Sequence, residues 1–373
     1  MRRSRIAPAA RLCLLGLLVA FSTAALASEF ANIQYLCCDW GPAMTLPAKK
    51  GEQPQFNEAE EEIYFLKQTG RFTRKLLPIP DVLSGNNARD EGRGISIYLC
   101  KMKPDGSDKT EIKELWRNPN YPIDTQGQST WMDVNRKTRK IVVSVMFAGT
   151  DVMGLWTMNL DGSEFRQIIR PEWGERLVGF DHPSWTPDGE WIVFEECLRG
   201  VHPKRFNIAI CDTQGQRLHR LFEATETIQY RQPSVSPDGK RIAFAQYPYG
   251  YPGGRVLWLA NIDGSDAHPL LDDKGKMIFG MDPAWRPDGK SIYVTSTSSE
   301  LVDVATGRVT LDHRPMLQGN PQGTCGWPHW GRTGFVGSSV GGILFTDLGM
   351  QEAHWIGSSK LVQCAWAKES CRW

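Results

Sequence analysis

The segment Pro183-Ser-Trp-Thr-Pro-Asp-Gly189 decides the fold, because the chain repeats it at a fixed spacing. Two further copies align with it without gaps, and the three starts lie 50 residues apart: Pro233-Ser-Val-Ser-Pro-Asp-Gly239 and Pro283-Ala-Trp-Arg-Pro-Asp-Gly289. A run of β-branched or aromatic residues follows each copy, and such runs favour strands. Weaker copies begin at Pro54, Ser129 and Pro328. This period indicates an array of similar small units.

A second motif recurs between these copies and ends in an Asp-Gly pair. It is found at residues 97–106, 155–162 and 257–264. Asp-Gly favours the positive φ angles of tight hairpins, so each copy predicts a strand that runs into a turn. Each repeat therefore reads as four antiparallel strands, which is the unit of a propeller blade. The sequence predicts an all-β protein, with a single β-propeller domain over residues 28–373.

Together the two motifs resemble the TolB-like β-propeller repeat, and the resemblance covers most of residues 53–350. We expect the aromatic residue of the Pro-x-Trp triplet to be buried between neighbouring blades, which concerns Trp131, Trp185 and Trp285. No segment resembles the α/β domain that precedes the propeller in TolB itself. The resemblance therefore does not extend to the role of TolB in its transport complex.

The two chain ends predict how the ring closes. Cys364-Ala-Trp366 stands where Pro-Ser-Trp stands in other repeats, and residues 33–41 resemble the later strand and turn of a repeat. We therefore expect the N- and C-termini to share one blade, which with six further blades gives seven. Six blades is the alternative, if the terminal strands join the first repeat instead.

Residues 1–27 read as a secretory signal peptide, with a basic start, a short apolar run and an Ala25-Leu-Ala27 cleavage site. We expect a periplasmic or extracellular protein without a membrane span. The signal holds four of the 43 basic residues and no acidic one, so the mature chain has 39 basic and 42 acidic residues. This balance, without a Lys/Arg block, argues against a nucleic-acid partner. We expect a monomer.

Export permits disulfides, and eight cysteines remain after removal of the signal. Cys37 and Cys38 near one end and Cys364 and Cys371 near the other could lock a shared blade. Two more candidates, Cys197 and Cys211, are expected on neighbouring strands of one blade. The alternative is that these cysteines are buried thiols that pack as small hydrophobes.

The residue before each Pro-x-Trp triplet defines a column that we expect at the mouth of the central channel. Its members and their neighbours supply the candidate ligand-binding residues, which are Gln128, Asp181, His182, Arg231, Gln232, Asp282, Trp327 and His329. We expect Asp282 to be an anion beside Arg231. His182, Asp282 and His329 are candidate ligands for a divalent metal. The alternative is a generic polar channel lining.

Two classes of function fit this pattern. The first is a binding or scaffolding propeller for a protein or oligosaccharide ligand. The second is a metal-dependent carbohydrate-active enzyme similar to oligogalacturonate lyases, with its site at the channel mouth. The sequence also predicts a long loop with four basic residues at 67–94, which could be a lid, a partner contact or a solvated segment.

Overall fold

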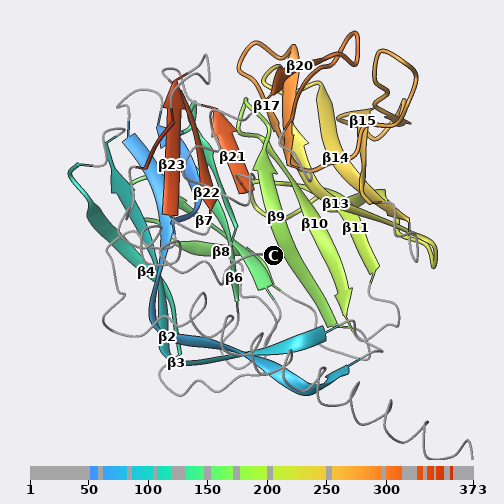
Figure 1. Cartoon of the computed structure of the whole chain (residues 1–373). Coiled ribbons are helices and arrows are strands. Elements are labelled where there is room, and N and C mark those ends of the chain that lie inside the picture. The colour runs from blue at the N-terminus through green and yellow to red at the C-terminus, as the bar shows by residue number, and fades with distance from the viewer. Residues whose placement is uncertain are drawn as a thin grey trace, which may run out of the picture.

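The computed structural model describes residues 51–57, 62–81, 86–103, 107–118, 131–146, 153–170, 177–199, 205–248, 254–295, 300–312, 326–330, 334–339, 342–347 and 353–355. Within these ranges every regular element is a strand, and the strands form six four-stranded sheets (Figure 1). We number these sheets 1 to 6 in chain order. The expected all-β architecture of antiparallel four-strand units is confirmed.

The first three sheets cover the N-terminal half of the described chain. Sheet 1 contains β1 (Gly51–Asn57), β2 (Glu62–Asp81), β3 (Asn86–Met102) and β4 (Thr110–Asn118). Sheet 2 contains β5 (Met132–Asn135), β6 (Lys140–Met146), β7 (Met153–Asn159) and β8 (Arg166–Ile169). Sheet 3 contains β9 (Leu177–Trp185), β10 (Trp191–Arg199), β11 (Arg205–Asp212) and β12 (His219–Phe222).

The last three sheets repeat the same order. Sheet 4 contains β13 (Ile228–Val235), β14 (Arg241–Pro248), β15 (Val256–Asn261) and β16 (His268–Pro269). Sheet 5 contains β17 (Met281–Trp285), β18 (Ser291–Thr295), β19 (Glu300–Asp303) and β20 (Val309–Asp312). Sheet 6 contains β21 (Gly326–Trp330), β22 (Gly334–Ser339), β23 (Gly342–Asp347) and β24 (Ala353–Trp355).

The Pro-Asp-Gly segments form the turns between the first two strands of sheets 3, 4 and 5. Their glycines have φ angles of 77°, 72° and 67°, a region that costs glycine little. In the first of these turns the Asp188 carboxylate accepts a hydrogen bond from the Glu190 amide at 2.9 Å. The repeated motif thus specifies each hairpin locally, as the sequence predicts.

The first strands of successive sheets contact one another. Contacts run from β1 to β5, then to β9, β13, β17 and β21, and β21 also contacts β1. This circle of first strands places one end of each sheet near a common axis. The chain ends that would form a shared blade, residues 1–50 and 356–373, lie outside the described residues, so that blade stays a prediction.

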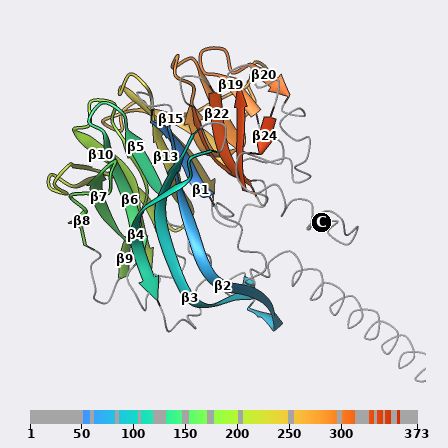
Figure 2. The same ribbon diagram turned by 90° about the vertical axis from the view of Figure 1, so that its left-hand side faces the viewer.

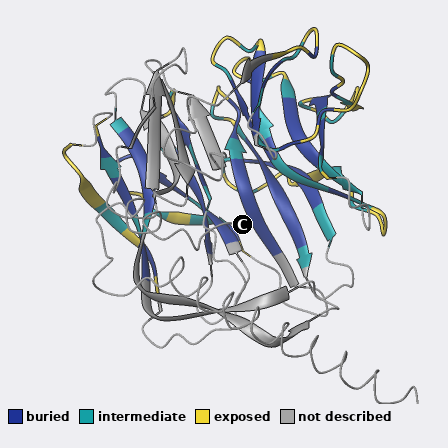
Figure 3. Ribbon diagram, viewed as in Figure 1, coloured by how far each residue is buried: buried dark blue, intermediate teal, exposed yellow. Residues whose placement is uncertain are grey.

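Apolar residues between neighbouring sheets form the core. Trp185 of sheet 3 is 5% exposed and belongs to a cluster with Val142 and Leu155 of sheet 2. Trp285 is 6% exposed and packs in the same way between sheets 4 and 5. Figure 3 shows buried residues along the strands and exposed residues mostly at the turns. The predicted role of these two tryptophans is confirmed.

The insertion at residues 67–94, expected as a loop, is instead a continuation of β2 and β3. The two strands pair from Thr69 with Ser96 to Leu76 with Ala88, and they form a ribbon that projects from sheet 1 (Figures 1 and 2). Pairing satisfies backbone donors and acceptors that an extended loop would leave to water. The expected loop is therefore wrong.

Cys197 and Cys211, the candidate disulfide pair within one blade, do not form a bridge, and the alternative of buried thiols holds for both. The two residues do lie on neighbouring strands, β10 and β11, and both are buried. However, Cys211 pairs with Ile192 and Cys197 with Phe206, so they lie five positions apart along the ladder. That separation, about 17 Å, far exceeds the span of a disulfide. Burial raises the pKa of the free Cys211 thiol to about 12. The four cysteines near the termini lie outside the described residues.

Candidate functional site

A β-bulge at each x-Pro pair positions the column residues. In sheet 3, His182 and Pro183 together face one residue of β10, because Ser184 pairs with Val193 and Asp181 with Glu195. Register shifts at the equivalent x-Pro pairs interrupt β1, β13, β17 and β21. Proline has no amide hydrogen for the ladder, so the bulge follows from the repeated sequence motif.

The bulge holds three column residues in a strained backbone conformation. His182, Gln232 and Asp282 have φ angles of 45°, 57° and 48°, which is the left-handed region. Such a conformation costs a residue other than glycine about 1–3 kcal/mol and is concentrated at functional sites. The same φ region in three successive repeats indicates that the x-Pro bulge, rather than the individual residue, sets this conformation.

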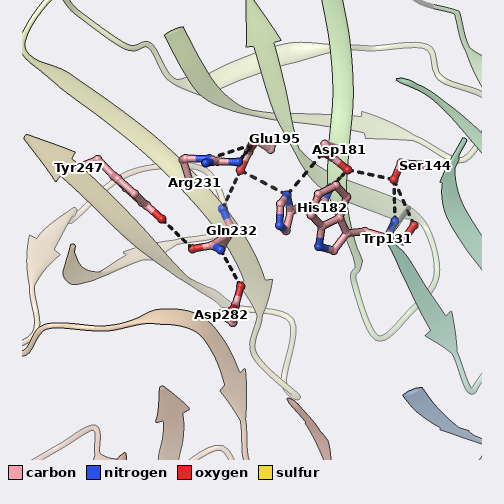
Figure 4. A network of polar contacts seen from close by, with 9 residues as sticks. All are labelled: Trp131, Ser144, Asp181, His182, Glu195, Arg231, Gln232, Tyr247 and Asp282. Carbon is pink, nitrogen blue, oxygen red and sulfur yellow. Dashed lines mark hydrogen bonds and ion pairs between the residues drawn. The ribbon is translucent and has the colours of Figure 1, made fainter. Parts of the chain in front are cut away.

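Asp181, His182 and Glu195 lie together in the interior of sheet 3 (Figure 4). The His182 Nδ1 atom is 3.4 Å from Glu195 Oε2 and 3.9 Å from Asp181 Oδ2. Asp181 Oδ1 faces the other way, where it accepts hydrogen bonds of 3.0 Å from the Ser144 hydroxyl and from the His182 amide. The Asp181 side chain is thereby fixed with Oδ2 directed toward the imidazole.

Arg231 connects this group to sheet 4. Its guanidinium donates to Glu195 Oε1 at 2.8 and 3.1 Å, and the Gln232 amide donates to Glu195 Oε2 at 3.1 Å. The Gln232 side chain in turn donates to Asp282 Oδ1 at 2.6 Å and accepts from the Tyr247 hydroxyl at 3.2 Å (Figure 4). The polar contacts therefore form a continuous network across sheets 3, 4 and 5.

Burial sets the charges of these groups. Burial would raise the pKa of Glu195, but the charge and hydrogen bonds of Arg231, together with His182 and the Gln232 amide, outweigh burial and lower that pKa below its ordinary value. Burial, and then the Glu195 charge, raise the pKa of Asp181 well above the ordinary range. Burial lowers the pKa of His182 to about 4. Near neutral pH the site therefore contains the Glu195–Arg231 ion pair beside a neutral imidazole.

His182 has unused hydrogen-bonding capacity. Its side chain is 8% exposed, and neither ring nitrogen makes a hydrogen bond within the protein. The Trp131 ring covers the imidazole, with 3.9 Å between the ring centroids. An imidazole that is buried without partners costs free energy, so this side chain is the one in the network best placed to interact with a ligand.

The structure brings together five of the eight candidate residues. Asp181, His182, Arg231, Gln232 and Asp282 belong to one network, but the partner of Arg231 is Glu195 rather than the expected Asp282. Gln128 lies outside the described residues. Trp327 and His329 lie on β21, but their side chains are not described. The candidate metal set of His182, Asp282 and His329 therefore stays a prediction.

Sequence reasoning missed Glu195 and misplaced Trp131. Glu195 lies in the apolar strand β10, and the aligned residues of sheets 4 and 5 are Ala245 and Thr295. A charged residue at a position that is uncharged in these copies of the repeat could have identified Glu195 from the sequence. The ladders pair Val134 with Ile141 as they pair Trp185 with Ile192, so Val134 rather than Trp131 has the position of Trp185. Trp131 lies three residues before Val134, as His182 lies three residues before Trp185. Trp131 is therefore half-buried in the column, and its expected place between blades is wrong.

A serine motif elsewhere does not have the context of a hydrolase nucleophile. Gly337-Ser-Ser-Val-Gly341 matches the pattern G-x-S-x-G. In hydrolases this pattern lies on a turn between a strand and a helix. Here Ser339 ends β22 and pairs with Gly342, the first residue of β23, so the motif spans a β-hairpin. The backbone does not support a catalytic serine at this position.

Comparisons with known proteins agree with this fold. No protein family model matches the chain. The uncharacterized protein Atu1656 of Agrobacterium fabrum is 26% identical over 144 residues, which cover 37% of this chain and 45% of that protein. The match thus spans less than half of the relative.

Among the described residues, no helix has the length and apolar character needed to cross a membrane.

Three solved structures illustrate the similarity. The S511A mutant of puromycin hydrolase, complexed with PGG, is 16% identical with a TM-score of 0.52, over 85% of this chain and 55% of that one. TolB from Acinetobacter baumannii is 15% identical with a TM-score of 0.45, over 76% and 62%. An oligogalacturonate lyase in complex with manganese is 15% identical with a TM-score of 0.45, over 80% and 90%.

The chain is an all-β protein of propeller type that carries a buried polar site on its inner strands. Its sequence repeat resembles the TolB-like propeller repeat. At these levels of identity the likeness concerns the fold alone.

Proposed function

We propose that this chain is an exported TolB-like propeller that binds a protein or glycan ligand. The ligand contacts the column arc, which we define as Trp131, His182, Gln232 and Asp282 on four successive sheets. The observation that carries the proposal is His182, which is buried in this arc without a hydrogen-bond partner. Concave clusters of fixed polar groups beside aromatic rings are typical of ligand sites.

Two features favour binding over catalysis. Both carboxylate oxygens of Glu195 already accept hydrogen bonds from Arg231 and Gln232, so Glu195 is poorly placed to take a proton from a substrate. The partly exposed members of the arc, Gln232 and Asp282, hold each other in a fixed geometry. A preorganised arc lowers the entropy cost of binding.

Site-specific photo-cross-linking tests the proposal. A photoreactive amino acid at position 232 should capture a ligand from exported proteins or from a panel of oligosaccharides. The same group at the exposed turn residue Gln214 is the matched control and should capture nothing in common. The double variant His182→Ala, Asp282→Ala should fold and lose this capture. Equal capture from both positions, or undiminished binding by the double variant, would reject the column arc as the site.

The alternative function is a metal-dependent carbohydrate-active enzyme of the oligogalacturonate-lyase kind. The observation that favours it is the proximity of Asp181, His182 and Glu195, whose ligand atoms lie within 4.8 Å of one another. Incubation with oligogalacturonate and Mn²⁺ would then produce the absorbance of unsaturated uronates, and a chelator would abolish it. If no absorbance develops, the binding function is retained.

We infer a ring of six blades. A seventh blade between sheets 6 and 1 would separate β21 from β1, whereas these strands contact each other. This supports the six-blade alternative that the sequence leaves open.

The proposed location in the periplasm or outside the cell rests on the predicted signal peptide at residues 1–27. N-terminal sequencing of the exported protein tests this location.

A further inference from the structure

We propose that Asp181, His182 and Glu195 form a binding site for a first-row divalent cation such as Mn²⁺ or Zn²⁺. The proposal concerns the metal alone and holds whether the chain binds a ligand or catalyses a reaction. Carboxylate oxygens and an imidazole nitrogen form the mixed donor set that these two ions accept.

The distances between the donor atoms suit such an ion. Two ligands at about 2.1 Å from a tetrahedral ion lie about 3.4 Å apart. The His182 Nδ1 atom is 3.4 Å from Glu195 Oε2 and 3.9 Å from Asp181 Oδ2, and the three ligand atoms lie within 4.8 Å of one another. An ion between them therefore requires only small side-chain shifts.

The hydrogen bonds that Asp181 and Glu195 accept leave one oxygen of each carboxylate directed at the point between the three ligand atoms. Asp181 uses Oδ1 for Ser144 and for the His182 amide, and Oδ2 faces the imidazole. Glu195 uses Oε1 for Arg231, while Oε2 accepts only the backbone amide of Gln232 and faces the same point. Metal ligands are commonly held in this way by surrounding hydrogen bonds, which fix their orientation.

The imidazole supplies an independent indication. His182 is more than nine-tenths buried, and its nitrogens have no hydrogen-bond partner within the protein. A purely structural histidine in such a place would be expected to donate at least one hydrogen bond. Coordination of a cation would satisfy the Nδ1 atom.

With an ion bound, the charges of the site balance closely. Metal ligands bind in the deprotonated form, so Asp181 and Glu195 would then carry two negative charges, of which Arg231 offsets one. A divalent ion compensates the remaining charge at a distance where the low dielectric makes the attraction strong. Arg231 contacts the far oxygen of Glu195, so it does not occupy the space between the three ligand atoms.

Metal titration of the purified chain tests the proposal. After treatment with a chelator, calorimetry with Mn²⁺ and separately with Zn²⁺ should show one equivalent bound, with weaker binding of Ca²⁺, which prefers oxygen ligands. Asp181→Asn and His182→Ala should each weaken binding at least about 100-fold, more than loss of a supporting hydrogen bond. His268→Ala removes an exposed histidine outside the network and should bind as the wild type does.

The design keeps folding and binding apart. Asparagine preserves the acceptor oxygen that holds Ser144, so Asp181→Asn removes the proposed ligand oxygen while keeping this contact between sheets. In the Mn²⁺ complex, electron-spin-echo spectroscopy should detect nitrogen coupling from a bound imidazole, and this signal should survive in His268→Ala. The absence of stoichiometric binding by the wild type, or equal affinity in Asp181→Asn, would overturn the proposal.

Discussion

Glu195 is the residue at which the chain departs most from its own repeat. A buried carboxylate replaces the Ala245 and Thr295 of the aligned strands, and its charge is balanced by Arg231 of the next sheet. Removing one member of a buried ion pair leaves the other charge without compensation. We predict that Glu195→Ala lowers the free energy of unfolding by about 3–5 kcal/mol.

The double variant Glu195→Ala, Arg231→Met is the control for this prediction, since Met281 is the residue aligned with Arg231 in sheet 5. It should recover much of the lost stability, because apolar replacements of buried ion pairs are often neutral. Chemical denaturation of both single variants and the double variant gives the coupling energy. Additive losses would show that the two charges do not depend on each other.

The buried carboxyl group of Asp133, which lies outside the polar network of the candidate site, makes the free energy of unfolding depend on pH. Its carboxylate accepts amide hydrogen bonds from Val134 and, across the interface between sheets, from Trp185. Burial raises its pKa from 3.8 to about 6. The folded state thus holds this proton more tightly than the unfolded chain. The stabilisation is fully present below about pH 4 and is lost as the pH rises through about 6.

The size of this effect follows from the shift of about two pKa units, which corresponds to about 3 kcal/mol. We expect the difference in unfolding free energy between the wild type and Asp133→Asn to be larger at pH 4 than at pH 7 by this amount. Taking the difference cancels other groups that titrate in the same range. A difference that is constant from pH 4 to pH 7 would show that Asp133 has an ordinary pKa.

At the scale of elements, the turns between the third and fourth strands pack against the preceding sheet. A Cβ atom on Gly215 would lie 2.1 Å from the backbone oxygen of Ile168 in sheet 2. Gly275 has almost the same φ angle, 76° against 74°, but a Cβ atom there would meet nothing within 4 Å. The two glycines therefore separate backbone strain from crowding between sheets.

We predict that Gly275→Ala costs about 1–2 kcal/mol of unfolding free energy, the penalty for the left-handed conformation alone. Gly215→Ala should cost a further 1–3 kcal/mol, about the cost of overpacking a well-packed interface. Thermal and denaturant unfolding of the two variants measure this difference. Equal losses would mean that the turn of sheet 3 does not press on sheet 2.

The local motifs were sufficient to predict the elements but not the ribbon of sheet 1. Each Pro-Asp-Gly or Asp-Gly segment encodes its own turn, so the four-strand unit can be read from the chain. Residues 71–81 contain Pro78 and Pro80, which argue against a strand, and the pairing of this segment with β3 depends on a partner that the local sequence does not reveal. Its register could therefore not be predicted.

The column of the candidate site was predictable for a similar reason, whereas its charges were not. The repeat aligned His182, Gln232 and Asp282, and the structure gives them the same bulged backbone. Glu195 reaches the site from the second strand of sheet 3, and Trp131 reaches it because Val134, three residues further along the chain, aligns with Trp185. Such contacts depend on strand register, which a motif in one strand does not specify.

At the scale of the whole molecule, the polar network requires several sheets to be docked together. Ser144 of sheet 2 donates a hydrogen bond to Asp181 of sheet 3, and Gln232 of sheet 4 donates to Glu195 of sheet 3 and to Asp282 of sheet 5. Within sheet 3, His182 lies beside both carboxylates, 3.4 Å from Glu195 Oε2 and 3.9 Å from Asp181 Oδ2. Separating any two neighbouring sheets among sheets 2 to 5 would separate members of the site. The docking of these four sheets and the integrity of the site are therefore coupled.

Two truncations test how the ring closes. A chain that ends at residue 355 keeps all six described sheets and the contact between β1 and β21. We predict that its melting temperature stays within about 2 °C of the wild type, which corresponds to less than about 1–2 kcal/mol for a domain of this size. A chain that ends at residue 325 loses sheet 6, which exposes the faces and edges of sheets 1 and 5.

The shorter chain should lose its cooperative transition or aggregate, because each blade depends on its neighbours for a buried face. Differential scanning calorimetry of both chains, with circular dichroism to verify β content, distinguishes the outcomes. If the chain that ends at residue 355 is destabilised as severely as the one that ends at residue 325, residues 356–373 close the ring. In that case the blade shared by the two termini replaces the six-blade ring inferred from the contact of β21 with β1.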